Sequence, residues 1–111
     1  MQDAVLSVIV PVYNTEQYLE ETIESVIVQT IGFEDYIQLI LVDNVTKDNS
    51  ALICKRYVEK YPQNIEYIKV KENHGPCSAR NAGMSIARGK YITFLDSDDK
   101  WENNAFEKAL A

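Results

Sequence analysis

Apolar, β-branched stretches alternate with helix-like segments along this chain, and this alternation constrains the fold more than any other feature. Residues 5–12 read VLSVIVPV and residues 36–42 read YIQLILV. Runs with so little polarity are typical of strands that are buried on both faces of a sheet. The stretches at 65–71 and 91–95 predict two further strands. Four strands separated by helices require crossover connections, which favour parallel pairing.

The segments between these strands carry apolar residues at helical spacing. They predict helices over residues 15–29, 51–61, 78–88 and from about Trp101 to the end of the chain. We expect Asn14 to cap the first helix and Gly89 to follow the third as its C′ residue. The predicted fold is therefore α/β, with a doubly wound, mostly parallel sheet and helices on both faces. At 111 residues the chain is long enough for one domain.

Polar clusters directly follow three of the predicted strands. They are Tyr13-Asn14, Asp43-Asn44 and the segment 96–99, which reads DSDD. In open α/β sheets, ligands bind outside the carboxyl ends of the strands. We therefore expect these clusters to meet at one edge of the sheet and to form a ligand site there.

The acidic cluster Asp96, Asp98 and Asp99 is the strongest chemical signal. Carboxylates this close repel one another, and a hard divalent cation such as Mg²⁺ or Mn²⁺ relieves the repulsion while keeping positions for substrate phosphates. The alternative is a solvated acidic loop that caps the following helix. Position directly after an apolar strand favours the metal site.

Charge and composition exclude several classes of partner. The formal net charge is −6, which argues against nucleic acid and anionic membranes as partners. We find neither a transmembrane segment nor a signal peptide in the sequence, and we expect a cytoplasmic location, although a segment outside this chain could tether an intact protein to a membrane. Two isolated cysteines, Cys54 and Cys77, make a poor metal site.

Four motifs together resemble glycosyltransferase family 2, whose members have the GT-A fold. They are VIVPVYN at 8–14, ILVD at 40–43 with DNS at 48–50, ENHG at 72–75 with SARNAG at 78–83, and GKYITFLDSDD at 89–99. The resemblance covers essentially the whole chain, in the family's order and spacing. It implies that residues 1–111 are the N-terminal, nucleotide-sugar-binding part of a GT-A domain, truncated before the acceptor half. A sheet cut in this way would expose an edge, and self-association is a resulting expectation.

The resemblance also implies a function and a set of site residues. Family members transfer a sugar from a nucleotide-diphosphate donor, commonly a UDP-sugar, to an acceptor hydroxyl with inversion, often in polysaccharide biosynthesis. Nucleotide contacts are implied for Pro11, Tyr13, Asp43, Asn44 and Asp96. Asp98, with Asp96, is implied to bind the divalent cation, Mn²⁺ or Mg²⁺. No residue of this chain can be assigned as the catalytic base, which the family carries in its later half.

One loop departs from the family pattern. The family usually reads DDGS where this chain has Asp43-Asn44-Val45-Thr46. Asn44 keeps an acceptor but loses the charge of an aspartate. Val45 replaces a glycine, and because a β-branched residue disfavours positive φ, we expect the loop to take another path.

Two alternatives to an enzyme fragment are a receiver-like regulatory module and a non-catalytic remnant. A receiver-like regulatory module has similar length and an acidic Mg²⁺ pocket, but it needs acidic residues after the first strand, where this chain has Val12-Tyr13-Asn14, and a fifth strand. A non-catalytic remnant that has lost the donor site is supported only by Asn44 and Val45.

Overall fold

A four-stranded sheet lies at the centre of the computed structural model, which describes residues 4–110. The elements in chain order are β1 (Leu6–Val12), α1 (Leu19–Ile27), α2 (Phe33–Tyr36), β2 (Ile37–Asp43), α3 (Ser50–Lys60), β3 (Ile65–Lys69), α4 (Pro76–Met84), β4 (Tyr91–Phe94) and α5 (Ala105–Leu110). The four strands lie within the stretches that the sequence predicts, apart from Asp43 at the end of β2. The short helix α2 was not predicted.

The strand order is β3-β2-β1-β4, and every neighbouring pair is parallel. β1 pairs with β2 along its whole length, from Leu6 opposite Ile37 to Val12 opposite Asp43. On its other side β1 pairs with β4, up to Ile9 opposite Phe94. The predicted α/β fold with a parallel sheet is confirmed, and the carboxyl ends of β1, β2 and β4 lie at the same edge.

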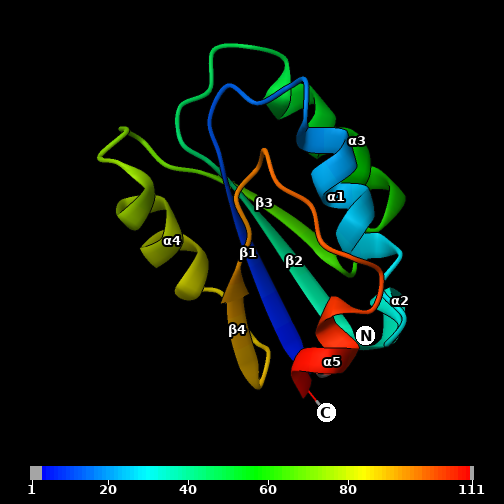
Figure 1. Ribbon diagram of the computed structural model, residues 1–111. Coiled ribbons are helices and arrows are strands. Elements are labelled where there is room, and N and C mark those ends of the chain that lie inside the picture. The colour runs from blue at the N-terminus through cyan, green and yellow to red at the C-terminus, as the bar shows by residue number, and fades with distance from the viewer. Residues whose placement is uncertain (1–3, 111) are drawn as a thin grey trace.

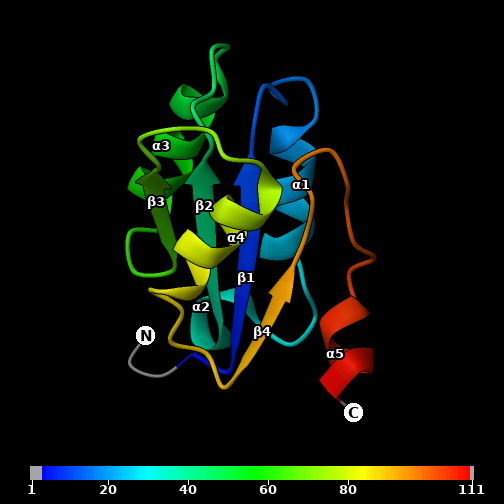
Figure 2. The same cartoon turned by 90° about the vertical axis from the view of Figure 1, so that its left-hand side faces the viewer.

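Helices cover both faces of the sheet, as predicted (Figures 1 and 2). Helix α4 lies on one face, while α1, α3 and α5 lie on the other. Val8 and Val10 of β1 are fully buried in the larger core on the α1 side, whereas Ile9 packs with Ala79 of α4 on the opposite side. This alternation explains why β1 and β2 are apolar at nearly every position.

A buried glutamine in the middle of β2 connects the strands to the segment after α4. The Gln38 amide donates to Glu66 Oε1 at 2.9 Å and to the Ile86 carbonyl at 3.1 Å. Its Oε1 accepts from Ser7 Oγ at 2.6 Å and from the Arg88 backbone N–H at 2.8 Å. Gln38 is fully buried, and these bonds satisfy both ends of its side chain.

This network explains why one predicted helix end is wrong. Helix α4 ends at Met84, not near Arg88, and Gly89 is not its C′ residue. Beyond Met84, the Ile86 carbonyl and the Arg88 N–H bond to Gln38 instead of continuing the helix. Gly89 has a different role, since an added Cβ there would lie 2.5 Å from the backbone nitrogen of Ser7.

The start of α1 is also later than predicted. The helix begins at Leu19 with Tyr18 as N-cap, so Asn14 is not the cap. Asn14 instead has φ +51°, and its side-chain oxygen accepts from the Lys47 backbone N–H at 2.7 Å. The side chain that was expected to begin a helix therefore joins two loops at the carboxyl edge of the sheet.

The last helix begins at Ala105 rather than near Trp101. Gln29, which follows α1, holds the preceding segment: its amide donates to the Glu102 carbonyl at 2.7 Å, and its Oε1 accepts from the Phe106 N–H at 3.1 Å. The Trp101 ring packs edge-on against Phe106, with the ring centroids 4.1 Å apart. These contacts hold the segment before α5 in a non-helical conformation, and the helix starts only at Ala105.

Strand β4 forms one edge of the sheet, and Tyr91, Ile92 and Phe94 on it are exposed. Self-association through this edge stays a prediction. None of the helices within residues 4–110 combines the length and apolar character needed to cross a bilayer.

Replacing the buried glutamine tests the polar network. In Gln38→Leu, the Ile86 carbonyl and the Arg88 N–H lose their side-chain partner. An unsatisfied buried polar group costs about 1–3 kcal/mol, so we expect the free energy of unfolding to fall by about 2 kcal/mol or more. Urea denaturation followed by circular dichroism measures this. Gln17→Leu, at an exposed position before α1, is the control. Equal urea midpoints for both variants would show that the network contributes nothing.

Candidate functional site

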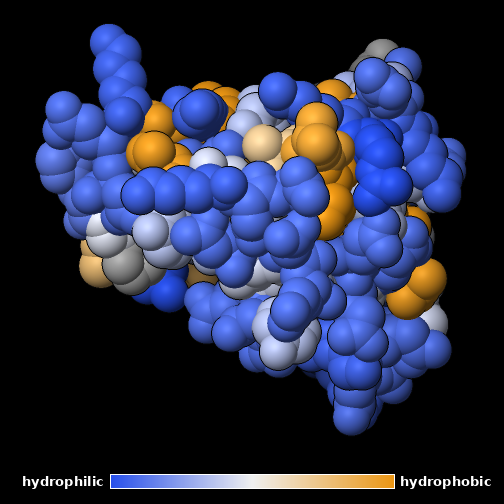
Figure 3. Space-filling model, turned by 90° about the horizontal axis from the view of Figure 1, so that it is seen from above, coloured by the Kyte–Doolittle hydropathy of each residue, from blue (hydrophilic) through white to orange (hydrophobic). Residues whose placement is uncertain are grey.

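A cleft of about 350 Å³ opens at the carboxyl edge of the sheet. Its lining residues are Pro11, Tyr13, Thr15, Asn44, Asn73, Asp96, Ser97 and Asp98. Seen from above, the surface over this edge is mainly hydrophilic and is broken by small hydrophobic patches (Figure 3). The cleft therefore lies where the polar clusters of the sequence predicted a ligand site.

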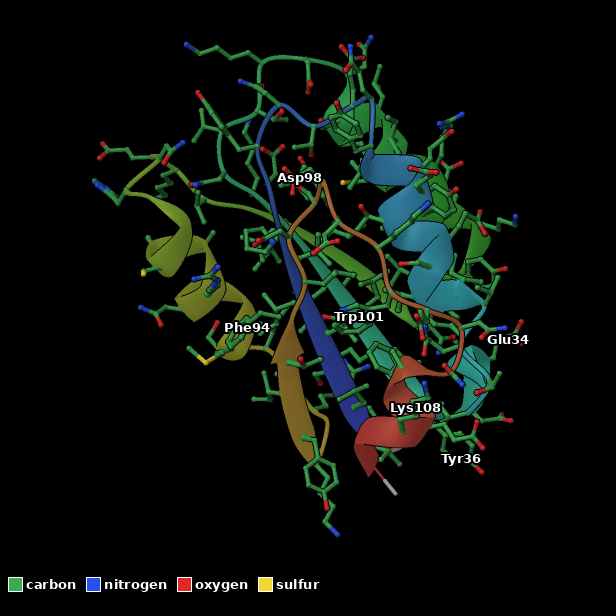
Figure 4. All side chains as sticks on the ribbon, in the orientation of Figure 1. Glu34, Tyr36, Phe94, Asp98, Trp101 and Lys108 are labelled. Carbon is green, nitrogen blue, oxygen red and sulfur yellow. The ribbon has the colours of Figure 1, made fainter. Side chains whose placement is uncertain are left out.

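The structure brings together all of the predicted site residues except Asp43. Pro11 and Tyr13 come from the end of β1, and Asn44 directly follows β2. Asp96 and Asp98 belong to the loop after β4, and Figure 4 places Asp98 at the tip of that loop. Tyr13 is 46% exposed and leaves an aromatic surface available at the cleft.

Asp43 does not line the cleft. Its side chain is 1% exposed; Oδ1 accepts from the Thr46 N–H at 2.7 Å, and Oδ2 accepts from the Tyr67 hydroxyl. Burial, together with this hydrogen bond to a carboxylate, raises the pKa of Tyr67, so the phenol stays a donor. In this arrangement Asp43 anchors the loop that presents Asn44.

Asn44 is 4% exposed, and the two ends of its side-chain amide differ in their hydrogen bonding. Its amide nitrogen donates to Asn73 Oδ1 at 3.1 Å and to the Gly75 carbonyl at 3.4 Å. Its own Oδ1 is buried and has no hydrogen-bond partner within residues 4–110. A buried acceptor without a partner costs free energy, which a donor from a ligand or water would recover.

Val45 has φ +63°, so the expectation that the loop avoids positive φ is wrong. The residues on both sides of Val45 are held by hydrogen bonds. The Thr46 N–H donates to the Asp43 carboxylate, and the Asn44 N–H donates to the Val12 carbonyl at 2.8 Å. These bonds keep the left-handed conformation although a β-branched residue resists it. The loop thus stores strain beside the cleft.

The acidic loop after β4 is held by hydroxyl groups from the α1 side. Thr15 Oγ1 donates to Ser97 Oγ at 2.8 Å. Thr22 Oγ1 lies 3.0 Å from the Ser97 carbonyl and 2.5 Å from the Asp99 carbonyl. Ser97 is buried, whereas Asp98 is exposed. The backbone of the loop is therefore fixed while the Asp98 carboxylate stays free of any hydrogen bond or ion pair to the described residues.

Two carboxylates and one arginine set the charge of the cleft. Arg80 of α4 lies 3.6 Å from Asp96 Oδ1, and its guanidinium stands 5.7 Å from the centre of the Phe94 ring. Asp96 and Asp98 line the cleft together, and both side chains are exposed. No cluster of three or more His, Cys, Asp or Glu side chains that could hold a metal ion occurs within the described part of the chain.

The donor set nevertheless fits a cation that is shared with a ligand. Mg²⁺ is commonly bound through one or two carboxylates, with waters and substrate phosphates as its other ligands. Asp96 and Asp98 supply two carboxylates, which are hard oxygen donors, at one cleft. A site of this type would be completed by the ligand.

Three lining residues, Thr15, Asn73 and Ser97, were not predicted as site residues. Asn73 and Ser97 lie within two of the family motifs, at 72–75 and 89–99, so the resemblance to the family is the signal that points to them. Thr15 follows Asn14 in the loop after β1, where the expected helix start suggested only a structural role.

Asp48 connects the two loops above β1 and β2. Its carboxylate accepts from Thr46 Oγ1 at 2.8 Å, from the Ser50 N–H at 2.9 Å and from the Glu16 N–H at 3.1 Å. Partial burial by itself raises the pKa of Asp48, but the hydrogen bonds from Ser50, Thr46 and Glu16 outweigh it and lower the pKa to about 2.

A family model and two similar proteins identify the same family for this chain. The model of "Glycosyl transferase family 2" matches residues 7–111. The chain is 57% identical to the "Minor teichoic acid biosynthesis protein GgaB" of Bacillus subtilis (strain 168) over 94% of this chain and 11% of that protein. It is 39% identical to the "Putative teichuronic acid biosynthesis glycosyltransferase TuaG" of the same organism, over 95% of this chain and 40% of that protein.

A solved structure shares the fold. S. aureus TarS 1-349 in complex with UDP superposes with a TM-score of 0.85 at 30% identity, covering 95% of this chain and 30% of that one. TarS 1-349 in complex with UDP-GlcNAc gives the same values. The chain spans between 11% and 40% of the length of the two B. subtilis relatives.

Val45→Gly tests the backbone strain at φ +63°. The left-handed conformation costs a residue with a Cβ about 1–2 kcal/mol, and glycine removes this cost. The greater freedom of glycine in the unfolded chain offsets about 0.4–1 kcal/mol of the gain. We expect Val45→Gly to raise the free energy of unfolding by about 1 kcal/mol. Val45→Ala, which keeps the Cβ, should gain far less. Urea denaturation of the three proteins gives the comparison, and an equal gain in both variants would contradict the assignment of strain.

The lowered pKa of Asp48 makes stability depend on pH. Because the folded-state pKa of about 2 lies below the ordinary value of 3.8, the carboxylate stabilises the fold above about pH 4, and this contribution is lost as the pH falls toward 2. Asp48→Asn should therefore be less stable than the wild type at pH 6, with the difference shrinking between pH 4 and pH 2.

Urea denaturation at pH 6, 4, 3 and 2 measures this difference. Asp35→Asn removes an exposed carboxylate that accepts no hydrogen bond from the described residues, and it is the matched control. A stability difference for Asp48→Asn that is the same at pH 6 and pH 2 would show that ionic hydrogen bonding is not its source.

Proposed function

The chain belongs to glycosyl transferase family 2, and from this we propose that the intact protein transfers a sugar from a nucleotide-diphosphate donor to an acceptor hydroxyl. The donor is a UDP-sugar, and transfer proceeds with inversion at the anomeric carbon. Residues 1–111 supply the donor-binding part of the catalytic domain. The remainder of the protein supplies the acceptor site and the catalytic base, since no residue of this chain is assigned to that role.

The observation that carries this proposal is the cleft at the carboxyl edge of the sheet. It combines an exposed aromatic ring at Tyr13, a polar side chain at Asn44 and two carboxylates at Asp96 and Asp98. An aromatic face can stack on a nucleobase, and a buried polar group can select its edge. The likeness to TarS in complex with UDP, which extends over 95% of this chain, supports a uridine nucleotide as the ligand.

We further propose that Asp98 and Asp96 hold Mg²⁺ or Mn²⁺ together with the diphosphate. When bound, such a cation stabilises the negative charge of the leaving diphosphate as a Lewis acid. Asp98 is suited to this because its carboxylate has no competing partner within residues 4–110, whereas Asp96 is shared with Arg80. Thr15, Thr22 and the buried Ser97 keep the loop in place, so that the backbone that carries the two carboxylates is fixed before the ligand arrives.

The relatives also indicate the kind of product. The name of GgaB refers to minor teichoic acid biosynthesis and that of TuaG to teichuronic acid biosynthesis. We propose that the acceptor of this protein is a growing cell-surface polymer of the same chemical class. The identity of the sugar and of the acceptor depends on residues outside this chain.

Calorimetric titration of UDP tests the donor site. We expect the wild-type chain to bind UDP in the presence of Mn²⁺ and at least tenfold more weakly without it, because the carboxylates repel the diphosphate when no cation intervenes. Asp98→Asn should lose the metal-dependent part of the affinity. Asp99→Asn is the matched control, since Asp99 does not line the cleft and its carboxylate accepts from the Lys100 N–H.

Each result separates the alternatives. Equal loss of affinity in Asp98→Asn and Asp99→Asn would contradict a specific metal-binding role for Asp98 and favour a general charge effect. Absence of UDP binding by the folded wild-type chain, with and without Mn²⁺, would favour the non-catalytic remnant that has lost its donor site.

A further inference from the structure

Positive charge gathers along one side of an otherwise acidic chain. Residues 47–71 carry six lysine and arginine side chains and three carboxylates, although the whole chain has a net charge of −6. Three of these lysines make up a lysine row: Lys55 of α3, Lys69 of β3 and Lys71 just beyond it. All three are exposed, and none forms an ion pair with the residues that the structure describes.

Strand alternation directs Lys69 to the α3 side of the sheet. Tyr67 packs against the core that contains residues of α1 and α3, whereas Ile68 and Val70 pack against the core beneath α4. Because successive side chains of a strand point to opposite faces, Lys69 lies on the same face as Tyr67. It therefore faces the side of the sheet that α3 covers.

The other two lysines extend the row on that face. The Lys55 Nζ lies 5.8 Å from the centre of the Tyr67 ring, so the end of this side chain stands beside β3. The Val70 N–H donates to the carbonyl of the last residue of β2 at 3.0 Å, and this bond continues the strand pairing past Lys69. Lys71 is therefore placed one step further along the same face.

Acidic side chains next to the row are mostly engaged elsewhere. Glu66 of β3 pairs with Arg88, and Glu72, which directly follows the row, has its Oε2 3.1 Å from Nε2 of His74. One turn of α3 separates Glu59 from the row, and Glu59 forms no ion pair with the described residues. A single free acid beside three lysines leaves an excess of positive charge on this surface.

The row leads to the candidate cleft. β3 lies at an edge of the four-stranded sheet. Lys69 stands opposite Asp43, the last residue of β2, and the next residue, Asn44, lines the cleft. Asn73, two residues after Lys71, lines it as well. A chain molecule held by the row would therefore pass from the side of the protein to the rim of the cleft.

We propose that the lysine row holds the acceptor polymer through negative charges that repeat along it, and keeps the polymer beside the cleft. The inference rests on the proposed function, because it takes the polymer to be the acceptor of the transfer. Lys69 and Lys71 are about 7 Å apart along an extended chain, so they can meet successive charges of a polymer. A lysine ammonium binds an anionic group as a point charge, which requires no fixed geometry and lets the polymer shift as it grows.

Titration with charged polymers tests the row. The probes are a phosphodiester-linked glycerol oligomer and polygalacturonate, which carries carboxylates, with dextran as the uncharged polymer. We expect the wild-type chain to bind at least one charged polymer and not dextran. The affinity should fall at least tenfold between about 0.02 M and about 0.2 M NaCl, because salt shortens the distance over which charges attract. The tighter-binding polymer identifies phosphate or carboxylate as the preferred group.

Two double variants with the same change in net charge separate the row from a general charge effect. Lys69→Gln with Lys71→Gln should weaken binding of the preferred polymer about tenfold, since each exposed ionic contact contributes a factor of about three. Lys90→Gln with Lys108→Gln removes two lysines before β4 and in α5, and it should stay within about twofold of the wild type. UDP affinity in Mn²⁺ should be unchanged in both, because none of the four lysines lines the cleft.

Circular dichroism confirms that each variant is folded. Equal weakening in the two double variants, or no binding of either charged polymer by a chain that binds UDP, overturns the inference while the proposed function stands. Tighter binding to phosphatidylglycerol vesicles than to either polymer would identify a membrane surface as the partner and also overturn it. Absence of UDP binding contradicts the proposed function, and the UDP titration reads this independently of the polymer titration.

Discussion

Strand β1 is hydrogen-bonded to β2 on one side and to β4 on the other, and six of its seven residues are buried. Polar side chains are costly inside such a strand unless they are paired, as Ser7 is with Gln38. The chain can therefore place most of its unpaired polar groups only where the strands end. Parallel pairing then brings the ends of β1, β2 and β4 to one edge, although the three segments are far apart in sequence. The cleft follows from this single constraint on burial.

Polar groups at that edge divide into those that hold the loops and those that are left over. Asp43 and Asp48 are fully engaged by backbone N–H groups and hydroxyls, and they fix the loop between β2 and α3, including the strained Val45. The Asn44 Oδ1 and the Asp98 carboxylate have no such partners among the described residues. Because satisfied groups contribute rigidity and unsatisfied ones contribute binding capacity, the two classes together describe a preorganised site.

The strands and the location of the site could be predicted from the sequence because burial on two faces leaves a strong local pattern. The ends of the helices could not, since they depend on side chains from distant segments. Gln38 in β2 binds the backbone that follows α4, and Gln29 binds the backbone that precedes α5. Asn14 was expected to begin a helix because its side chain is a good cap, but the backbone of Lys47, which only folding brings near, binds it instead. Local propensity is a weak prior wherever a distant partner competes for the same group.

The same reasoning explains why two adjacent residues of one motif behave differently. Asp43 is the last residue of β2, and Asn44 follows it directly, so strand alternation directs them to opposite sides. Asp43 meets Tyr67 of β3, whereas Asn44 reaches the segment before α4. A sequence motif identifies both as polar residues at a strand end and cannot separate them, because the distinction depends on which distant segment each side chain meets in the folded chain.

Charge completes the account of the cleft. The chain carries a net charge of −6 and places Asp96 and Asp98 at a site proposed for an anionic diphosphate. Coulomb repulsion between these groups is only partly relieved by Arg80, which lies 3.6 Å from Asp96, since the pair is exposed to solvent. Asp98 is left without a counter-charge within residues 4–110. For the diphosphate ligand proposed above, this arrangement of charge favours binding together with a cation, which would offset the repulsion between the ligand and the carboxylates.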